Sequence, residues 1–79
     1  MMNPSAFETK KRFVTCTLSR CVAAMYPRVC RLEYHLHDNG DEVVVIRCMD
    51  GYTARVDVTG LELRATVDAV LAEFSTEVA

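Results

Sequence analysis

Apolar and polar residues alternate over residues 29–37 and 52–58, and this period of two predicts a strand in each segment. The run Val-Val-Val-Ile at residues 43–46 lies between them and would be apolar on both faces of a strand. Turn signals at residues 38–41 and 50–51 separate the three segments. Something must cover the second apolar face of the middle strand. The pattern therefore predicts an antiparallel meander with strands at residues 29–37, 42–49 and 52–58.

Apolar residues that recur mostly at three- and four-residue spacing predict a first helix over residues 4–26. The stripe that they form consists of Phe7, Val14, Leu18, Cys21, Val22 and Met25. Ser5 and Glu8 have the spacing of a capping box, and Pro27 ends the pattern because the residue before a proline avoids helical geometry. Residues 13–18, however, have the β-branched and aromatic composition of a strand. A short strand over residues 13–18 is therefore the alternative to a continuous helix.

A second helical stripe follows the meander and predicts a helix over residues 60–77, with Thr59 and Glu62 as its capping box. No linker, repeat or low-complexity segment interrupts the chain. We therefore expect one α+β domain over residues 1–79, of order α-β-β-β-α. In this fold a three-stranded antiparallel meander packs with two helices.

The two turns predict how the strands pair. Each has the residues of a type I turn followed by a left-handed glycine, at Gly40 and at Gly51. Two-residue turns would instead direct Arg47 into the core, and an unpaired buried guanidinium is costly. We therefore expect the pairs Leu32–Ile46, Tyr34–Val44, Ile46–Ala54 and Val44–Val56. One almost wholly apolar face would then carry Cys30, Leu32, Tyr34, Leu36, Val44, Ile46, Cys48, Tyr52, Ala54, Val56 and Val58.

The opposite face in this register is apolar at its centre and charged around it. Such an arrangement is typical of a protein interface, in which arginine is enriched. The alternative is that the N-terminal helix covers this face while the C-terminal helix covers the other. The residues expected there are Val29, Arg31, Glu33, His35, Val43, Val45, Arg47, Met49, Thr53, Arg55 and Asp57.

We interpret this second face as a partner-binding surface, with apolar anchors and arginines that supply charge-assisted hydrogen bonds. Self-association through the same face is equally compatible, and a twofold homodimer is the commonest closed solution. The predicted partner-binding residues are Arg31, His35, Val43, Val45, Arg47, Met49 and Arg55.

Charge is distributed unevenly along the chain. Residues 1–37 hold six Lys or Arg against two acids, a net charge of +4, whereas residues 38–79 hold three Arg against nine acids, a net charge of −6. This asymmetry favours docking through charge complementarity, although two solvated faces would look the same. No signal peptide or apolar run of spanning length is visible, so we expect a soluble, cytoplasmic protein. In that compartment the four cysteines are expected to be reduced and largely buried.

The motifs of catalysis and of cofactor binding are missing from the sequence. The cysteines contain no C-x-x-C pair, and the three glycines are isolated in turns. Glu33, His35 and His37 share one side of a strand, with Asp41 or Glu42 nearby, but this spacing is common by chance. We therefore expect no enzyme activity, no metal site and no cofactor.

The predicted order of elements is similar to that of the double-stranded-RNA-binding domain, and residues 10–12, Lys-Lys-Arg, form a basic cluster. That family places lysines at the start of its last helix and a Gly-Pro-x-His type loop between its first two strands. Here residues 59–62 and 38–41 occupy those places and are acidic, which would repel phosphate. A nucleic-acid-binding regulator is therefore the alternative function, with the basic residues Lys10, Lys11, Arg12, Arg20 and Arg28.

The function that we favour from the sequence is a small non-catalytic protein-interaction module, an inhibitor or adaptor that occludes a macromolecular partner. Small, motif-free, charge-polarised proteins of this sort are often encoded by phages and mobile elements as inhibitors of host machinery, anti-CRISPR proteins among them. The partner is expected to be a protein, a second copy of the chain, or both, and not a membrane.

Overall fold

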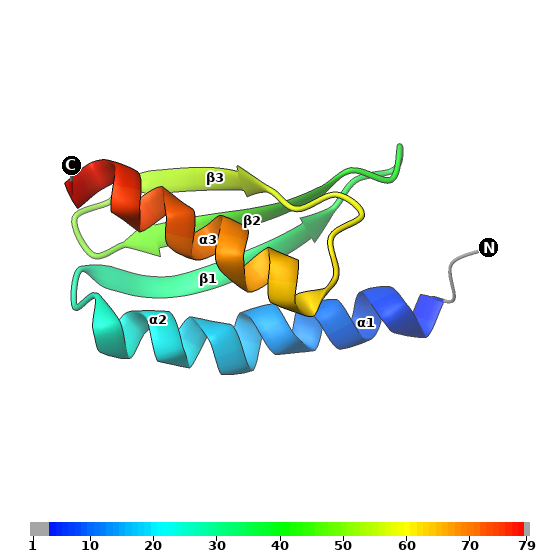
Figure 1. Ribbon diagram of the computed structural model, residues 1–79, viewed down its shortest axis with the longest axis horizontal. Coiled ribbons are helices and arrows are strands. Elements are labelled where there is room, and N and C mark those ends of the chain that lie inside the picture. The colour runs from blue at the N-terminus through cyan, green and yellow to red at the C-terminus, as the bar shows by residue number, and fades with distance from the viewer. Residues whose placement is uncertain (1–3, 79) are drawn as a thin grey trace.

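The computed structural model describes residues 4–78, with side chains described over residues 6–74 (Figure 1). A long N-terminal helix is followed by a three-stranded antiparallel sheet and a C-terminal helix, which confirms the predicted α+β order. None of the described helices has both the length and the hydrophobicity that a membrane span requires. The elements are α1 (Pro4–Arg12), the π-helical segment η1 (Phe13–Leu18), α2 (Ser19–Met25), β1 (Val29–Leu36), β2 (Glu42–Cys48), β3 (Thr53–Asp57) and α3 (Leu63–Val78).

The N-terminal helix runs without a break from α1 through η1 to α2. The alternative of a strand over residues 13–18 is wrong, but the segment is irregular: it forms the π-helix η1. β-branched and aromatic residues fit an α-helix poorly because they crowd the preceding turn. The helix ends before Pro27, where Tyr26 is extended. The side chain of Ser5, and with it the predicted capping box, lies outside the described side chains.

The residues that the helix buries against the sheet follow one line, with Ser19 beside it. Lys10, Val14, Leu18 and Val22 are buried at four-residue intervals. Cys21 and Met25, which we expected in the apolar stripe, lie beside this line and are exposed. Only part of the predicted stripe therefore reaches the core.

The strand register is the one that the turns predict. Leu32 pairs with Ile46 and Tyr34 with Val44, while β3 places Ala54 opposite Ile46 and Val56 opposite Val44. Both turns end in a glycine with positive φ, 95° at Gly40 and 89° at Gly51. Each glycine N–H bonds the carbonyl three residues earlier, as in a type I turn.

A bulge at the start of β1 corrects the prediction for its first residues. Val29 pairs with Cys48 and Arg31 pairs with Arg47, so Cys30 is the additional residue. The bulge turns Val29 into the core and leaves Cys30 exposed, the reverse of our expectation. The more hydrophobic side chain therefore fills the core position.

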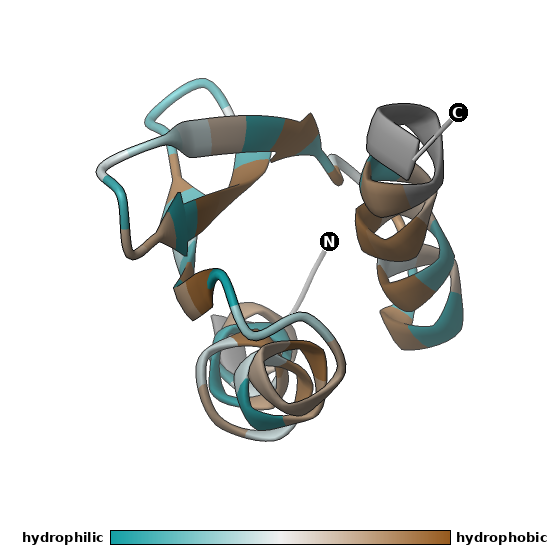
Figure 2. Ribbon diagram, turned by 90° about the vertical axis from the view of Figure 1, so that its left-hand side faces the viewer, coloured by the Kyte–Doolittle hydropathy of each residue, from teal (hydrophilic) through white to brown (hydrophobic). Residues whose placement is uncertain are grey.

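Both helices pack on the same face of the sheet, which Figure 1 shows from the front and Figure 2 from one end. The alternative in which each helix covers one face is therefore wrong. Leu36 and Tyr52 belong to the inner face but lie at the strand ends, where about half of each side chain stays exposed. The core that the helices and the sheet share consists of Val14, Leu18, Val22, Val29, Leu32, Tyr34, Val44, Ile46, Ala54, Val56, Val58, Val70 and Phe74.

The C-terminal helix α3 begins at Leu63, three residues later than predicted. The predicted capping box does not form because the Thr59 hydroxyl donates to the Asp57 carboxylate at 2.6 Å and accepts the Glu42 N–H at 2.9 Å. Thr59 therefore fastens the β3–α3 turn to the start of β2. Glu62 precedes the first helical residue, and its carbonyl accepts the Thr66 N–H.

The four cysteines lie in the described part of the chain and form no disulfide there, and their predicted burial is wrong. Cys16, Cys21 and Cys30 are exposed, and Cys48 is half-buried. Valines and leucines occupy the neighbouring inward positions of the helix and of β1, which leaves Cys16, Cys21 and Cys30 on the outward side, whereas Cys48 packs against the core.

Candidate functional site

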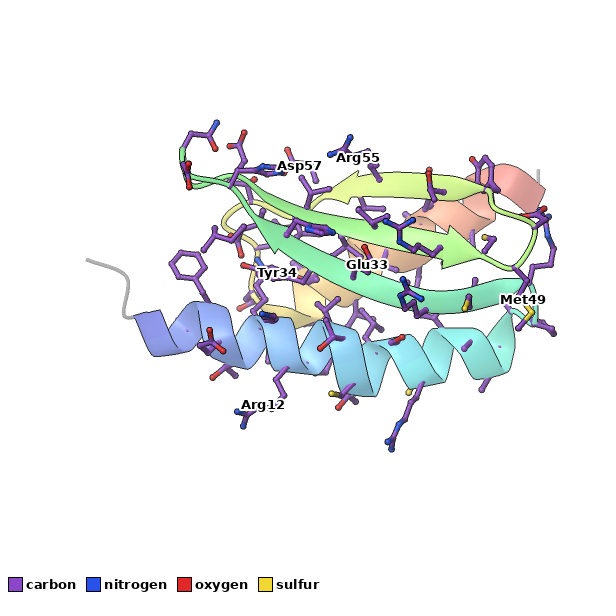
Figure 3. All side chains as sticks on the ribbon, turned by 180° about the vertical axis from the view of Figure 1, so that it is seen from behind. Arg12, Glu33, Tyr34, Met49, Arg55 and Asp57 are labelled. Atoms are coloured by element: carbon purple, nitrogen blue, oxygen red, sulfur yellow. The ribbon has the colours of Figure 1, made fainter. Side chains whose placement is uncertain are left out.

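The face of the sheet opposite the helices is the candidate site, and Figure 3 shows it turned toward the viewer. Side chains alternate along each strand, so every second residue of the three strands reaches this surface. We call it the outer sheet face. It consists of Arg31, Glu33 and His35 of β1, Val43, Val45 and Arg47 of β2, and Thr53, Arg55 and Asp57 of β3.

Glu33 is the centre of a charged cluster on this face. Its Oε2 accepts hydrogen bonds from Arg47 Nε at 2.5 Å and from Arg31 Nη2 at 2.9 Å. Its Oε1 lies 3.1 Å from His35 Nε2. One carboxylate therefore holds three basic side chains in place, two from its own strand and one from β2.

The Glu33 cluster changes the acidity of its carboxyl group. Hydrogen bonds from Arg47, His35 and Arg31 stabilise the ionised form and lower the pKa of Glu33 from 4.5 to about 2. The same contact with Glu33 raises the pKa of the Arg47 guanidinium, so both groups stay charged over the physiological pH range.

A pH titration of stability tests the Glu33 cluster. The depressed pKa means that the unfolded chain binds the proton first as pH falls. The stabilisation is therefore complete above the unfolded-state pKa of 4.5 and is lost as pH falls from there to about 2. We expect Glu33→Gln to flatten the fall in melting temperature over this interval. Equal slopes for wild type and variant in thermal denaturation would contradict the assignment.

The apolar anchors that we predicted are less available than the alternation suggests. Val45 is on the outer sheet face but only 8% exposed, because charged neighbours on β1 and β3, Glu33 and Arg55, flank it. Val43 is half-buried. Met49 is 75% exposed but lies in the β2–β3 turn, at the end of the sheet near α2 (Figure 3). The valines therefore support the surface, and charged side chains form most of it.

A shallow hollow of about 290 Å³ lies on the outer sheet face. None of its lining residues is acidic, and two of them are arginines. Among the described residues no ion pair engages the Arg55 guanidinium, whereas Arg47 is held through Nε by Glu33. The hollow therefore offers cationic groups to a ligand. Its lining is His35, His37, Val45, Arg47, Thr53 and Arg55.

The basic cluster of the N-terminal helix is arranged differently from the prediction. Lys10 is buried, and its Nζ lies 2.8 Å from Glu42 Oε1 and donates to the Val58 carbonyl at 2.8 Å. Arg28 pairs with Asp50 at 2.9 Å. Lys10 is therefore a core residue, and the predicted nucleic-acid surface loses its first member.

Glu42 is the partner that holds Lys10 in the core. It also accepts the Tyr34 hydroxyl at 2.6 Å and the Gly60 N–H at 2.8 Å. Burial raises its pKa, but the hydrogen bonds from Lys10, Tyr34 and Gly60 outweigh burial, so that the pKa is lowered and the carboxylate stays ionised. Burial and the adjacent carboxylate raise the pKa of the Tyr34 phenol.

The residues that we considered for metal binding are not brought together. Glu33 and His35 contact each other within the Glu33 cluster, whereas Glu42 is on the inner face. Within residues 4–78 no group of three His, Cys, Asp or Glu side chains has an arrangement that could hold a metal ion.

The structure therefore groups four of the predicted partner-binding residues, Arg31, His35, Arg47 and Arg55, on one charged surface. Our sequence reasoning missed the central role of Glu33, although its place opposite Val45 and its neighbouring arginines were the signal. Comparisons with protein-family models, with curated proteins and with solved structures give no match to this chain.

Proposed function

We propose that the protein is a non-catalytic interaction module that binds a protein partner through the outer sheet face and acts as an inhibitor or adaptor by occluding the partner's surface. The observation that carries this proposal is that both helices pack on the inner face. The outer sheet face is left with a built cluster of arginines around Glu33.

The arrangement of the arginines supports a protein partner with exposed carboxylates. Arg31 and Arg47 are fixed by Glu33, so their unused N–H groups are presented in a set geometry at a reduced entropic cost of binding. Arg55 is the cation on this face that has no ion pair within the described chain. Arginine forks match carboxylates with two parallel hydrogen bonds.

A capture experiment tests the proposal with Arg47→Glu as the disrupting variant. It reverses one cation of the outer sheet face and sets a second carboxylate beside Glu33. We expect the tagged variant to lose the protein that wild type retains from a nuclease-treated native lysate, with binding at least about tenfold weaker. The matched control is Arg12→Glu, the same charge change on α1, where the side chain points away from the sheet (Figure 3).

Circular dichroism must show that both variants are folded before the captures are compared. Equal capture by Arg47→Glu and wild type would contradict the proposal, as would equal loss in the Arg12→Glu control. Val45→Asp is a poor substitute, because Val45 is nearly buried and the change would mix loss of binding with loss of stability.

A further inference from the structure

The two edge strands of the sheet, β1 and β3, differ in their contact with the N-terminal helix. At the β1 edge the Leu32 N–H donates to the Ser19 hydroxyl of α2 at 3.0 Å, so the N-terminal helix closes this edge. The β3 edge lies on the opposite side of the sheet, at the top of Figure 1, away from that helix. An uncovered strand edge is a template for pairing with another strand.

The ladder between β2 and β3 shows which backbone groups point outward at this edge. Cys48 donates its N–H to the Tyr52 carbonyl, and Val58 donates its N–H to the Glu42 carbonyl. Hydrogen-bonded pairs alternate with non-bonded pairs in an antiparallel ladder, so Ala54 and Val56 also face β2. The N–H and C=O groups of Thr53, Arg55 and Asp57 therefore point away from the sheet.

We propose that β3 pairs antiparallel with β3 of a second copy of the chain, about a twofold axis at Val56, to form a six-stranded sheet. In this register Arg55 of each copy is opposite Asp57 of the other. Both pairs exchange backbone hydrogen bonds, because both residues present outward-facing groups. The second copy thus supplies the complementary charge for Arg55, which has no ion pair within the described chain.

The charges of Arg55 and Asp57 favour the axis at Val56 over an axis at either of the two preceding residues. A twofold axis at Arg55 would place two guanidinium groups directly opposite each other, which destabilises a strand pair. An axis at Ala54 would leave Asp57 beyond the paired segment, and no opposite charge would face Arg55. The axis at Val56 satisfies two ion pairs at once and joins the outer sheet faces of the two copies.

A charge swap tests the pairing on the purified full chain by sedimentation equilibrium. Each single variant, Arg55→Asp or Asp57→Arg, creates two like-charge contacts across the axis, so we expect its dimer dissociation constant to rise by on the order of tenfold or more. The double variant Arg55→Asp/Asp57→Arg recreates both pairs and should return within about threefold of wild type. Arg64→Asp, an exposed charge reversal on α3, is the control and should not change dimerisation.

The variants at residue 57 could also lose stability, because Asp57 binds Thr59. Amide hydrogen exchange of the wild-type chain is a second measurement that does not depend on these variants. In wild type, the amides of Arg55 and Asp57 should gain protection as protein concentration rises. A wild-type chain that stays monomeric at millimolar concentration would overturn the proposal, as would a folded double variant that does not recover dimerisation. These outcomes are separate from those of the capture experiment, which changes Arg47.

Discussion

Replacing Lys10 with methionine is expected to lower the free energy of unfolding by about 3–5 kcal/mol, because it leaves Glu42 as a buried charge without its cation. Methionine keeps most of the length of the side chain, so little of the effect comes from a cavity. Urea denaturation measures the change. Lys11→Met, on the exposed neighbour, is the control and should shift stability by less than about 0.5 kcal/mol.

The double variant Lys10→Met/Glu42→Gln separates the cost of losing the ion pair from the cost of leaving Glu42 charged without its cation. A neutral amide at residue 42 can still accept the Gly60 N–H and contact Tyr34. We expect the double variant to be more stable than Lys10→Met alone, since replacing a buried pair with neutral groups costs less than breaking it. The comparison also needs the single variant Glu42→Gln. If the stability lost in the double variant equals the sum of the losses in Lys10→Met and Glu42→Gln, the two residues do not act as a pair.

Phe74→Ala is expected to destabilise the fold by about 3–5 kcal/mol, the range for truncating a buried aromatic side chain. Phe74 of α3 stacks on Tyr26 with ring centroids 4.2 Å apart and planes inclined by 8°. This contact joins the C-terminal helix to the end of the N-terminal helix. The variant should therefore also lose part of the near-ultraviolet circular dichroism of tyrosine.

Met25→Ala is the matched control for Phe74→Ala, because Met25 lies just before Tyr26 but is more than half exposed. It should cost well under about 1 kcal/mol in the same denaturation measurement. If Phe74→Ala costs no more than Met25→Ala, the stacked pair is not a structural junction between the two helices.

The sheet was predictable because local chemistry sets its register. Each turn needs a left-handed residue at one position, and Gly40 and Gly51 supply it. Once the turn length is known, the period of two assigns Val44 and Ile46 to the core. The bulge at Cys30 was not predictable in this way, because a bulge changes which residues point inward without altering the pattern around it.

The side of the sheet that each helix covers does not follow from periodicity. A helical stripe shows which face of the helix is buried, but not which face of the sheet it meets. The charges offered a better signal, since Arg31, Glu33 and Arg47 share one face and none could be buried unpaired under a helix. Reading that face as closed to both helices would have excluded the alternative in which the N-terminal helix covers it.

Lys10 was misplaced because a lysine on a helix is normally solvated. Two observations together would have placed it correctly. Lys10 is four residues before Val14 on the buried line, and Glu42 is two residues before Val44 on the inward side of β2. Opposite charges at two inward positions indicate a buried pair.

The π-helical segment η1 keeps the buried line of the N-terminal helix on the side that faces the sheet. Four residues of an α-helix overshoot one turn by about 40°, so side chains at successive four-residue steps drift around the axis. From Lys10 to Val22 this drift would reach about 120°, and one end of the line would leave the sheet. A π-helical turn holds more residues and rotates less per residue, which cancels part of the drift. The irregular hydrogen bonding at residues 13–18 is therefore what allows one straight helix to place a lysine over Glu42 and a valine in the hydrophobic core.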